Sequence, residues 1–140
     1  WACAAAGEQT SPLVAPALRL LGNLLSASAD AVGDAVVAAG ALAVLAEAVP
    51  SASAPLQVRC EAAWALSNMA AGTPSQVQHL VGSARAVAAL CVVLEADAPE
   101  DLRRECAWAV ASLARRGPEL PKHLDRKRLL RATAAALGAG

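Results

Sequence analysis

The chain has 140 residues, which is enough for one domain or for about three helical repeats of 40–47 residues. Hydrophobic residues make up 56% of it, much of this fraction is alanine, and phenylalanine and tyrosine are absent. This composition argues against a β-sheet and favours short, closely packed helices. The net charge is zero, but residues 1–114 hold ten acidic and five basic side chains (−5), and residues 115–140 hold two acidic and seven basic (+5).

The apolar stretches, broken by Gly, Pro and Asp, predict a succession of helices. No charge-free apolar run approaches the roughly 20 residues of a membrane span, so we expect none. Asp30 and Thr73 are expected as N-terminal caps, Gly40 as a helix stop, and Gly72 as a left-handed C-terminal cap. The expected helices cover residues 12–27, 31–39, 41–49, 55–71, 74–81, 84–95, 100–115, 118–124 and 125–137, with 1–6 as the end of an earlier helix.

One segment recurs along the chain. CEAAWALSN, which starts at Cys60, is similar to ECAWAVAS at Glu105 and to PALRLLGN at Pro16. Offsets of 44 and 45 residues indicate stacked helical repeats, and three helices per unit favour armadillo over HEAT repeats. We therefore predict an all-α armadillo solenoid, a right-handed superhelix of about three repeats. The single domain 1–140 would contain units 1–29, 30–72, 73–117 and a partial unit 118–140.

The helix 55–71 carries polar residues on one face. Glu61, Trp64 and Asn68 follow each other at i, i+3 and i+7, whereas Leu66 and Met69 belong to the opposite, apolar face. A tryptophan one turn from an amide, away from the apolar face, predicts a binding surface. The equivalent positions are Glu61 and Glu105; Arg19, Trp64 and Trp108; and Asn23, Asn68 and Ser112.

With PALRLLGNLLS, AGALAVL, CEAAWALSNMAAG and RECAWAVASLARRG in this order, the chain resembles consecutive repeats of importin-α, the nuclear-import adaptor. The resemblance covers about residues 12–117 and points to the repeats around the minor site for nuclear localisation signals. It implies a protein that binds Lys/Arg-rich peptides of cargo proteins, works in cytoplasm and nucleus, and meets a transport receptor through parts that this chain lacks. It assigns peptide binding to Arg19, Asn23, Glu61, Trp64, Asn68, Glu105, Trp108 and Ser112.

The chemistry of these side chains suits that role. An asparagine amide can both donate to and accept from a peptide group, and an indole face attracts a Lys or Arg cation by about 0.5–2 kcal/mol. The carboxylates of Glu61 and Glu105 would pair with the cations. Ser112 stands where the signature has asparagine, so we expect a looser clamp there. Binding of this kind needs no cofactor.

Several alternatives stay open. The tryptophans could pack between repeats, the glutamates could be solvated, and the asparagines could form buried inter-repeat hydrogen bonds. An armadillo scaffold for a different protein partner is the second functional hypothesis. A nucleic-acid contact through the basic cluster is the third, and it is disfavoured because no aromatic residues are interleaved. The basic cluster comprises Lys122, Arg126, Lys127, Arg128 and Arg131.

No catalytic constellation is recognisable, so we expect no enzyme. His79 and His123 lie one repeat apart and make a poor metal site. The four cysteines are far apart in the sequence, which favours reduced, buried thiols in a cytosolic or nuclear protein. They are Cys3, Cys60, Cys91 and Cys106.

Overall fold

The computed structural model describes residues 11–27, 29–116 and 125–138, and these ranges form eight helices and no strand. The all-helical prediction is confirmed, whereas the expected helical segments 1–6 and 118–124 lie outside the described residues. In chain order the helices are α1 (Val14–Leu25), α2 (Asp30–Ala38), α3 (Ala41–Ala48), α4 (Leu56–Ala71), α5 (Pro74–Gly82), α6 (Ala84–Glu95), α7 (Glu100–Arg115) and α8 (Arg126–Gly138).

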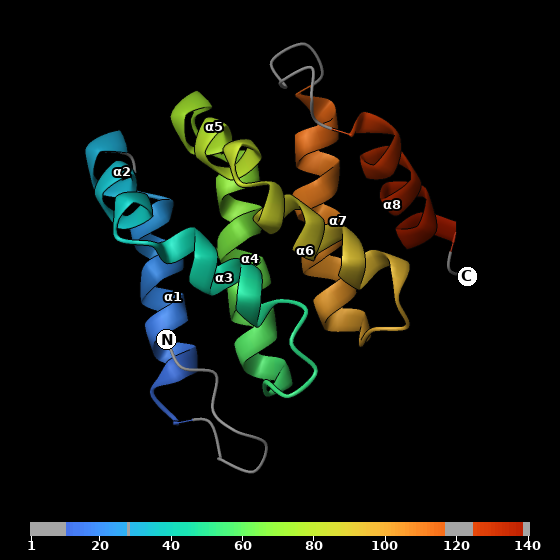
Figure 1. Cartoon of the computed structure of the whole chain (residues 1–140), viewed down its shortest axis with the longest axis horizontal. Coiled ribbons are helices and arrows are strands. Elements are labelled where there is room, and N and C mark those ends of the chain that lie inside the picture. The colour runs from blue at the N-terminus through green and yellow to red at the C-terminus, as the bar shows by residue number, and fades with distance from the viewer. Residues whose placement is uncertain (1–10, 28, 117–124, 139–140) are drawn as a thin grey trace.

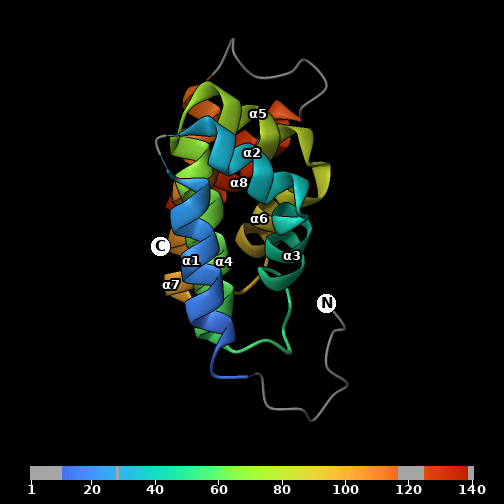
Figure 2. The ribbon, with the colours of Figure 1, turned by 90° about the vertical axis from the view of Figure 1, so that its left-hand side faces the viewer.

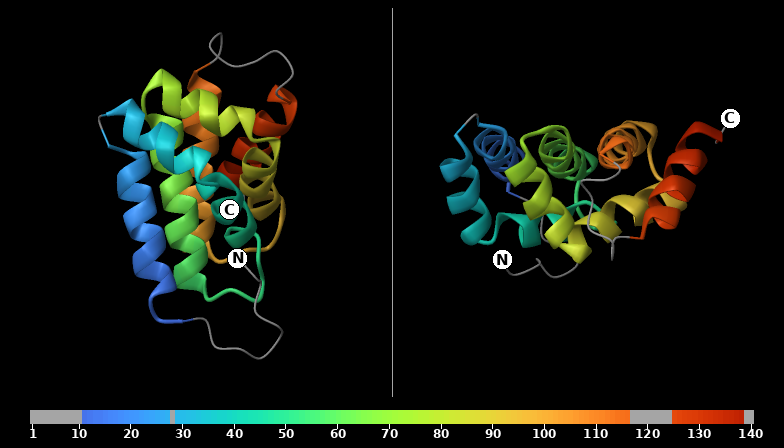
Figure 3. Two further views of the ribbon diagram at one scale, coloured as in Figure 1. Left: turned by 60° about the vertical axis from the view of Figure 1, so that its left-hand side comes forward. Right: turned by 90° about the horizontal axis from the view of Figure 1, so that it is seen from above.

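The helices stack in two layers. The long helices α1, α4 and α7 lie side by side in one row, and α2, α3, α5 and α6 form the second layer (Figures 1 and 3). Helix α3 contacts α6, and α2 contacts α5, so each short helix meets its equivalent in the next unit. Two successive units, α2–α4 and α5–α7, thus repeat one arrangement of two shorter helices and one long helix. This is the predicted α-solenoid.

Helix α4 lies at the centre of the stack, in contact with both α1 and α7 (Figure 2). Its predicted apolar face is confirmed, because Leu66 and Met69 are completely buried. Burial of a side chain of this size contributes about 1.5–3 kcal/mol. Neighbouring alanines, Ala62, Ala63, Ala65 and Ala70, are also at 0% exposure. Their small side chains let α1 and α7 approach the backbone of α4 closely.

Local sequence signals explain several helix ends. The Thr73 side chain accepts a hydrogen bond from the Gln76 backbone amide, and the Gln76 side chain accepts one from the Thr73 amide. This capping box satisfies two amides that have no partner within the helix. Pro74 follows as the first helical residue, where its missing N–H costs nothing. Gly40, with φ of 93°, adopts the left-handed conformation that separates α2 from α3.

Two predicted caps are wrong. Asp30 is the first residue of α2 and does not cap it; its carboxylate accepts a hydrogen bond from the Thr73 hydroxyl at 2.7 Å. Gly72 is extended, with φ of −81° and ψ of −156°, because the chain passes directly into the capping box of α5. A Cβ there would lie 1.7 Å from the Gln76 side-chain oxygen and would displace the amide that completes the capping box.

Helix α8 continues the stack beyond α7. It contacts α6 and α7, and its exposed basic side chains include Lys127 and Arg131. Arg128 donates two hydrogen bonds of 2.9 Å to the two carboxylate oxygens of Glu95 on α6. These hydrogen bonds lower the pKa of Glu95. A bidentate ion pair therefore helps to hold α8 against α6.

Among the described residues, no single helix has both the length and the apolar character to cross a membrane. Two bent pairs, α2 with α3 and α5 with α6, reach that threshold together by length and composition. The described residues contain no group of three or more His, Cys, Asp or Glu side chains suited to hold a metal ion.

Candidate functional site

The predicted site residues lie on the three long helices, and all but Asn23 and Ser112 fall into two groups that share Trp64. The first group is a contact between α1 and α4. Arg19 donates a hydrogen bond of 2.6 Å to Glu61, and its guanidinium lies 4.8 Å from the centre of the Trp64 ring. The hydrogen bond to Glu61 raises the pKa of Arg19. The chain thus provides its own cation for one tryptophan and one carboxylate.

Glu61 and Trp64 are consequently less accessible than the sequence suggests. Glu61 is 8% exposed, and its second carboxylate oxygen is buried without a hydrogen bond to the described residues. The Trp64 ring lies against α1, where a Cβ on Gly22 would be 2.6 Å from the ring. Packing between repeats, one of the open alternatives, therefore describes the α1 side of Trp64.

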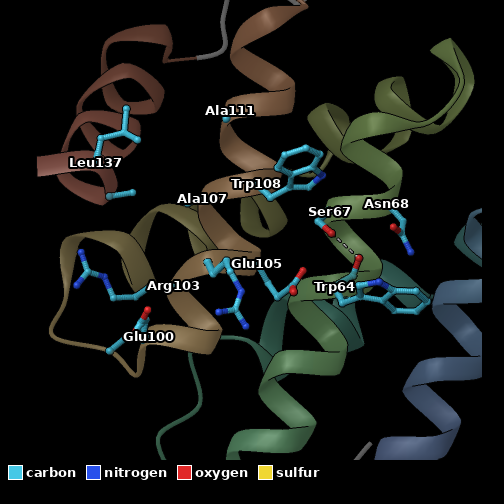
Figure 4. A pocket seen from close by; sticks show the side chains of 13 residues that line it. Trp64, Ser67, Asn68, Glu100, Arg103, Glu105, Ala107, Trp108, Ala111 and Leu137 are labelled. Atoms are coloured by element: carbon cyan, nitrogen blue, oxygen red, sulfur yellow. Dashed lines mark hydrogen bonds between the residues drawn. The ribbon is translucent and has the colours of Figure 1, made fainter. Parts of the chain in front are cut away.

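The second group lies in a cleft that runs over α7, between α4 and α8. It has a volume of about 890 Å³ and opens to solvent (Figure 4). Four predicted residues line it: Trp64, Asn68, Glu105 and Trp108. The remaining lining residues are Ser67, Ala98, Glu100, Arg103, Arg104, Ala107, Ala111, Ala136 and Leu137.

Trp108 is the most accessible aromatic side chain of the described residues, with 59% exposure. Its surroundings differ from those of Trp64, because by the repeat offset Ser67 of α4 stands where α1 has Gly22. The Ser67 side chain occupies space that is left open beside Gly22. Arg115, two turns further along α7, lies 5.9 Å from the Trp108 ring centre, at the outer limit of a cation–π contact. Trp64 therefore packs against α1, whereas Trp108 is exposed to solvent.

The two asparagines occupy equivalent positions on α1 and α4. Asn23 is exposed and Asn68 is partly buried, and neither amide forms a hydrogen bond with another described residue. The buried inter-repeat hydrogen bond, proposed above as an alternative, is thus not seen in the described part of the chain. Asn23 does not line the cleft, whereas Asn68 offers its amide there.

Ser112 differs from the sequence expectation. It is 3% exposed and does not line the cleft, and its hydroxyl makes no hydrogen bond with the described residues. A hydroxyl is too short to reach from this position on α7 to the surface, where a longer asparagine amide could extend. Ser112 therefore does not offer its side chain to a ligand in the cleft.

The charges in the cleft are balanced, although the body of the chain is acidic. The α7 side of the cleft carries two acidic and two basic side chains, those of Glu100, Glu105, Arg103 and Arg104. Arg104 is paired with Asp101 at 2.7 Å, in an exposed ion pair of the kind that contributes little to stability. Sequence analysis did not identify these arginines. The i, i+4 spacing of residues 100, 104 and 108 could have placed Arg104 near Trp108.

The described cysteines are free thiols that lie outside the cleft. Burial raises the pKa of Cys106 to about 12 and also raises that of Cys91. Both thiols therefore stay protonated at neutral pH and pack as small apolar side chains. Cys60 is half-buried, and burial raises its pKa as well.

Comparison of the sequence with known protein families identifies one helical repeat, in agreement with the stacked helices of the structure. Residues 34–71, from within α2 to the last residue of α4, match the Armadillo/beta-catenin-like repeat. A search of curated proteins finds no match to the chain. The matched unit is similar to a repeat class whose members generally bind protein partners, and α5–α7 repeat its arrangement of helices. The match concerns the repeat class and does not single out importin-α.

Proposed function

We propose that this chain binds an extended Lys/Arg-containing peptide of the nuclear-localisation-signal type along the cleft, as an adaptor in protein import between cytoplasm and nucleus. The observation that carries this proposal is the exposed Trp108 ring, which shares the cleft with Glu105 and Asn68. An indole face, a carboxylate and an unbonded amide are the three groups that hold a cationic side chain and the peptide group beside it.

The Arg19 contact supports this chemistry. It holds a guanidinium over an indole and against a carboxylate within the chain itself. Because that guanidinium lies over Trp64, a cation from a peptide is best accommodated on the other side, between Trp64 and Trp108. Figure 4 shows Glu105 in this region, between α7 and α4. Arg19 and Glu61 then hold Trp64 from α1 and α4, and neither they nor Asn23 line the cleft.

The test is fluorescence anisotropy of a labelled Lys/Arg-rich peptide with the full chain and with Trp108→Ala. Loss of a cation–π contact of about 0.5–2 kcal/mol corresponds to weakening by roughly 2- to 30-fold. Leu20→Ala is the matched control, because Leu20 is 58% exposed on α1 and does not line the cleft. Equal binding by Trp108→Ala and wild type would contradict the proposal.

A scaffold for a protein segment that is not basic is the second candidate. The observation in its favour is the charge balance of the cleft, where two arginines offset two glutamates. If wild type fails to bind the basic peptide, this second candidate becomes the preferred function.

A further inference from the structure

We propose that the peptide held in this cleft carries an acidic side chain, Asp or Glu, about three residues from its Lys or Arg, and that Arg103 binds it. This inference rests on the proposed function and specifies the class of peptide. A purely basic peptide would satisfy the carboxylates of the cleft but would place another positive charge against Arg103.

The cleft has two chemically different ends. The tryptophan end consists of Trp64, Asn68, Glu105 and Trp108, and the arginine end consists of Arg103, Ala136 and Leu137. Figure 4 shows Arg103 and Leu137 on the α8 side of α7, away from Trp64 and Asn68. The tryptophan end therefore suits a positively charged side chain and the arginine end a negatively charged one, and the two ends lie on opposite sides of α7.

Arg103 has no partner of its own in the described part of the chain. Its guanidinium forms no hydrogen bond or ion pair with a described residue, and its Nε atom is buried without an acceptor. The buried Nε cannot be reached by a ligand, but Arg103 itself lines the cleft, and a carboxylate accepts two parallel hydrogen bonds from the outer N–H groups of a guanidinium. Glu100 lies one turn away on α7 and is not ion-paired with Arg103.

A peptide can reach from one end of the cleft to the other because only small side chains lie between the two ends. Ala107 and Ala111 line the cleft on α7, and their short side chains leave room for a backbone to cross the helix. Neighbouring helices are about 8–10 Å apart, a distance that an extended chain covers in about three residues at about 3.3 Å each. A Lys or Arg at the tryptophan end therefore brings a residue about three positions away in the peptide to Arg103.

The experiment compares two labelled peptides that differ only in one side chain, a carboxylate against an amide. The first contains Lys-Arg-Ala-Ala-Asp between Gly/Ser flanks, and the second contains Lys-Arg-Ala-Ala-Asn between the same flanks. With wild type we expect the Asn peptide to bind about tenfold more weakly, the effect of one charged hydrogen bond. With Arg103→Gln the two peptides should bind equally, whereas Arg85→Gln, an exposed arginine outside the cleft, should behave as wild type.

Glu100→Gln should change the affinity for the Asp peptide in the opposite direction to Arg103→Gln. It removes the neighbouring carboxylate that repels the peptide acid, so we expect tighter binding of the Asp peptide and little change for the Asn peptide. Circular dichroism of each variant verifies that the helices are intact.

The outcomes separate the two proposals. Equal affinity of both peptides for wild type, with binding still lost in Trp108→Ala, would overturn the acidic preference and leave the proposed function standing. A discrimination that persists in Arg103→Gln would assign the acid to another residue and overturn the role of Arg103. If wild type binds neither peptide, the proposed function fails and this inference fails with it.

Discussion

At the scale of single residues, the two tryptophans differ in exposure. Trp64 and Trp108 hold equivalent positions on α4 and α7. Gly22 lets the Trp64 ring lie close against α1, whereas the equivalent residue on α4 is Ser67, which carries a side chain. Trp64 therefore packs against a neighbouring helix, and Trp108 is 59% exposed.

Gly22→Ala tests this contact. Alanine favours a helix over glycine by about 0.5–1 kcal/mol, but overpacking costs about 1–3 kcal/mol. Because the new Cβ would lie 2.6 Å from the Trp64 ring, we expect overpacking to dominate. Urea unfolding should show a net loss of about 1–2 kcal/mol. Gly82→Ala is the control, since a Cβ there meets no atom within 4 Å and should be neutral or stabilising.

At the scale of elements, polar contacts join equivalent helices of neighbouring units. Asp34 on α2 accepts hydrogen bonds from His79 at 2.6 Å and from Ser75 at 3.2 Å, both on α5. His79 thus bridges two neighbouring units. The hydrogen bond from His79, with a smaller contribution from Ser75, lowers the pKa of Asp34. The contact thus makes the α2–α5 stacking dependent on pH.

The sign of that dependence follows from the lowered pKa. The folded chain binds the Asp34 proton more weakly than the unfolded chain, so the stabilisation is present above the unfolded value of about 3.9 and is lost as pH falls through the folded one. We expect Asp34→Asn to lower the melting temperature at about pH 6, and we expect the difference from wild type to shrink as pH falls below about 3.9.

Asp97→Asn is a suitable control for this measurement. Asp97 lies in the exposed loop before α7 and has no hydrogen bond or ion pair with another described residue. A difference between wild type and Asp34→Asn that stays constant across this pH range would contradict the assigned role of the carboxylate.

At the scale of the whole molecule, the charges are segregated along the chain and balanced where the cleft lies. The excess of positive charge after residue 114 belongs partly to α8, where Arg128 is already paired with Glu95. The described basic side chains are therefore not all available to a phosphate backbone. This distribution favours a peptide over a nucleic acid as partner.

Salt dependence distinguishes these partners. A protein with six to ten phosphate contacts loses about 10³–10⁵ in affinity between about 50 and 200 mM salt. For the Asp-containing peptide in a balanced cleft, we expect a change of less than about threefold over that range. Anisotropy titrations with the peptide and with a labelled single-stranded oligonucleotide would measure both. Tight oligonucleotide binding with a steep salt slope would favour the nucleic-acid hypothesis.

Local patterns in the sequence were sufficient for the helices and the stacking. The prolines and the threonine cap at position 73 act through neighbours within a few residues, and the 44–45-residue period is visible in the sequence itself, so these signals could be recognised directly. The apolar face of α4 followed from its 3.6-residue periodicity. The same periodicity placed Trp64, Asn68, Glu105 and Trp108 on the cleft side of their helices.

Tertiary structure alone decided how these residues are used. The pairing of Arg19 with Glu61, the burial of Ser112 and the arginine end of the cleft depend on contacts between helices about 40 residues or more apart, or on the placement of α8. The extended Gly72 likewise depends on the side chains around it. Sequence periodicity specifies which face of a helix a residue occupies, whereas the residue's partner on that face is set by the packing of separate repeats.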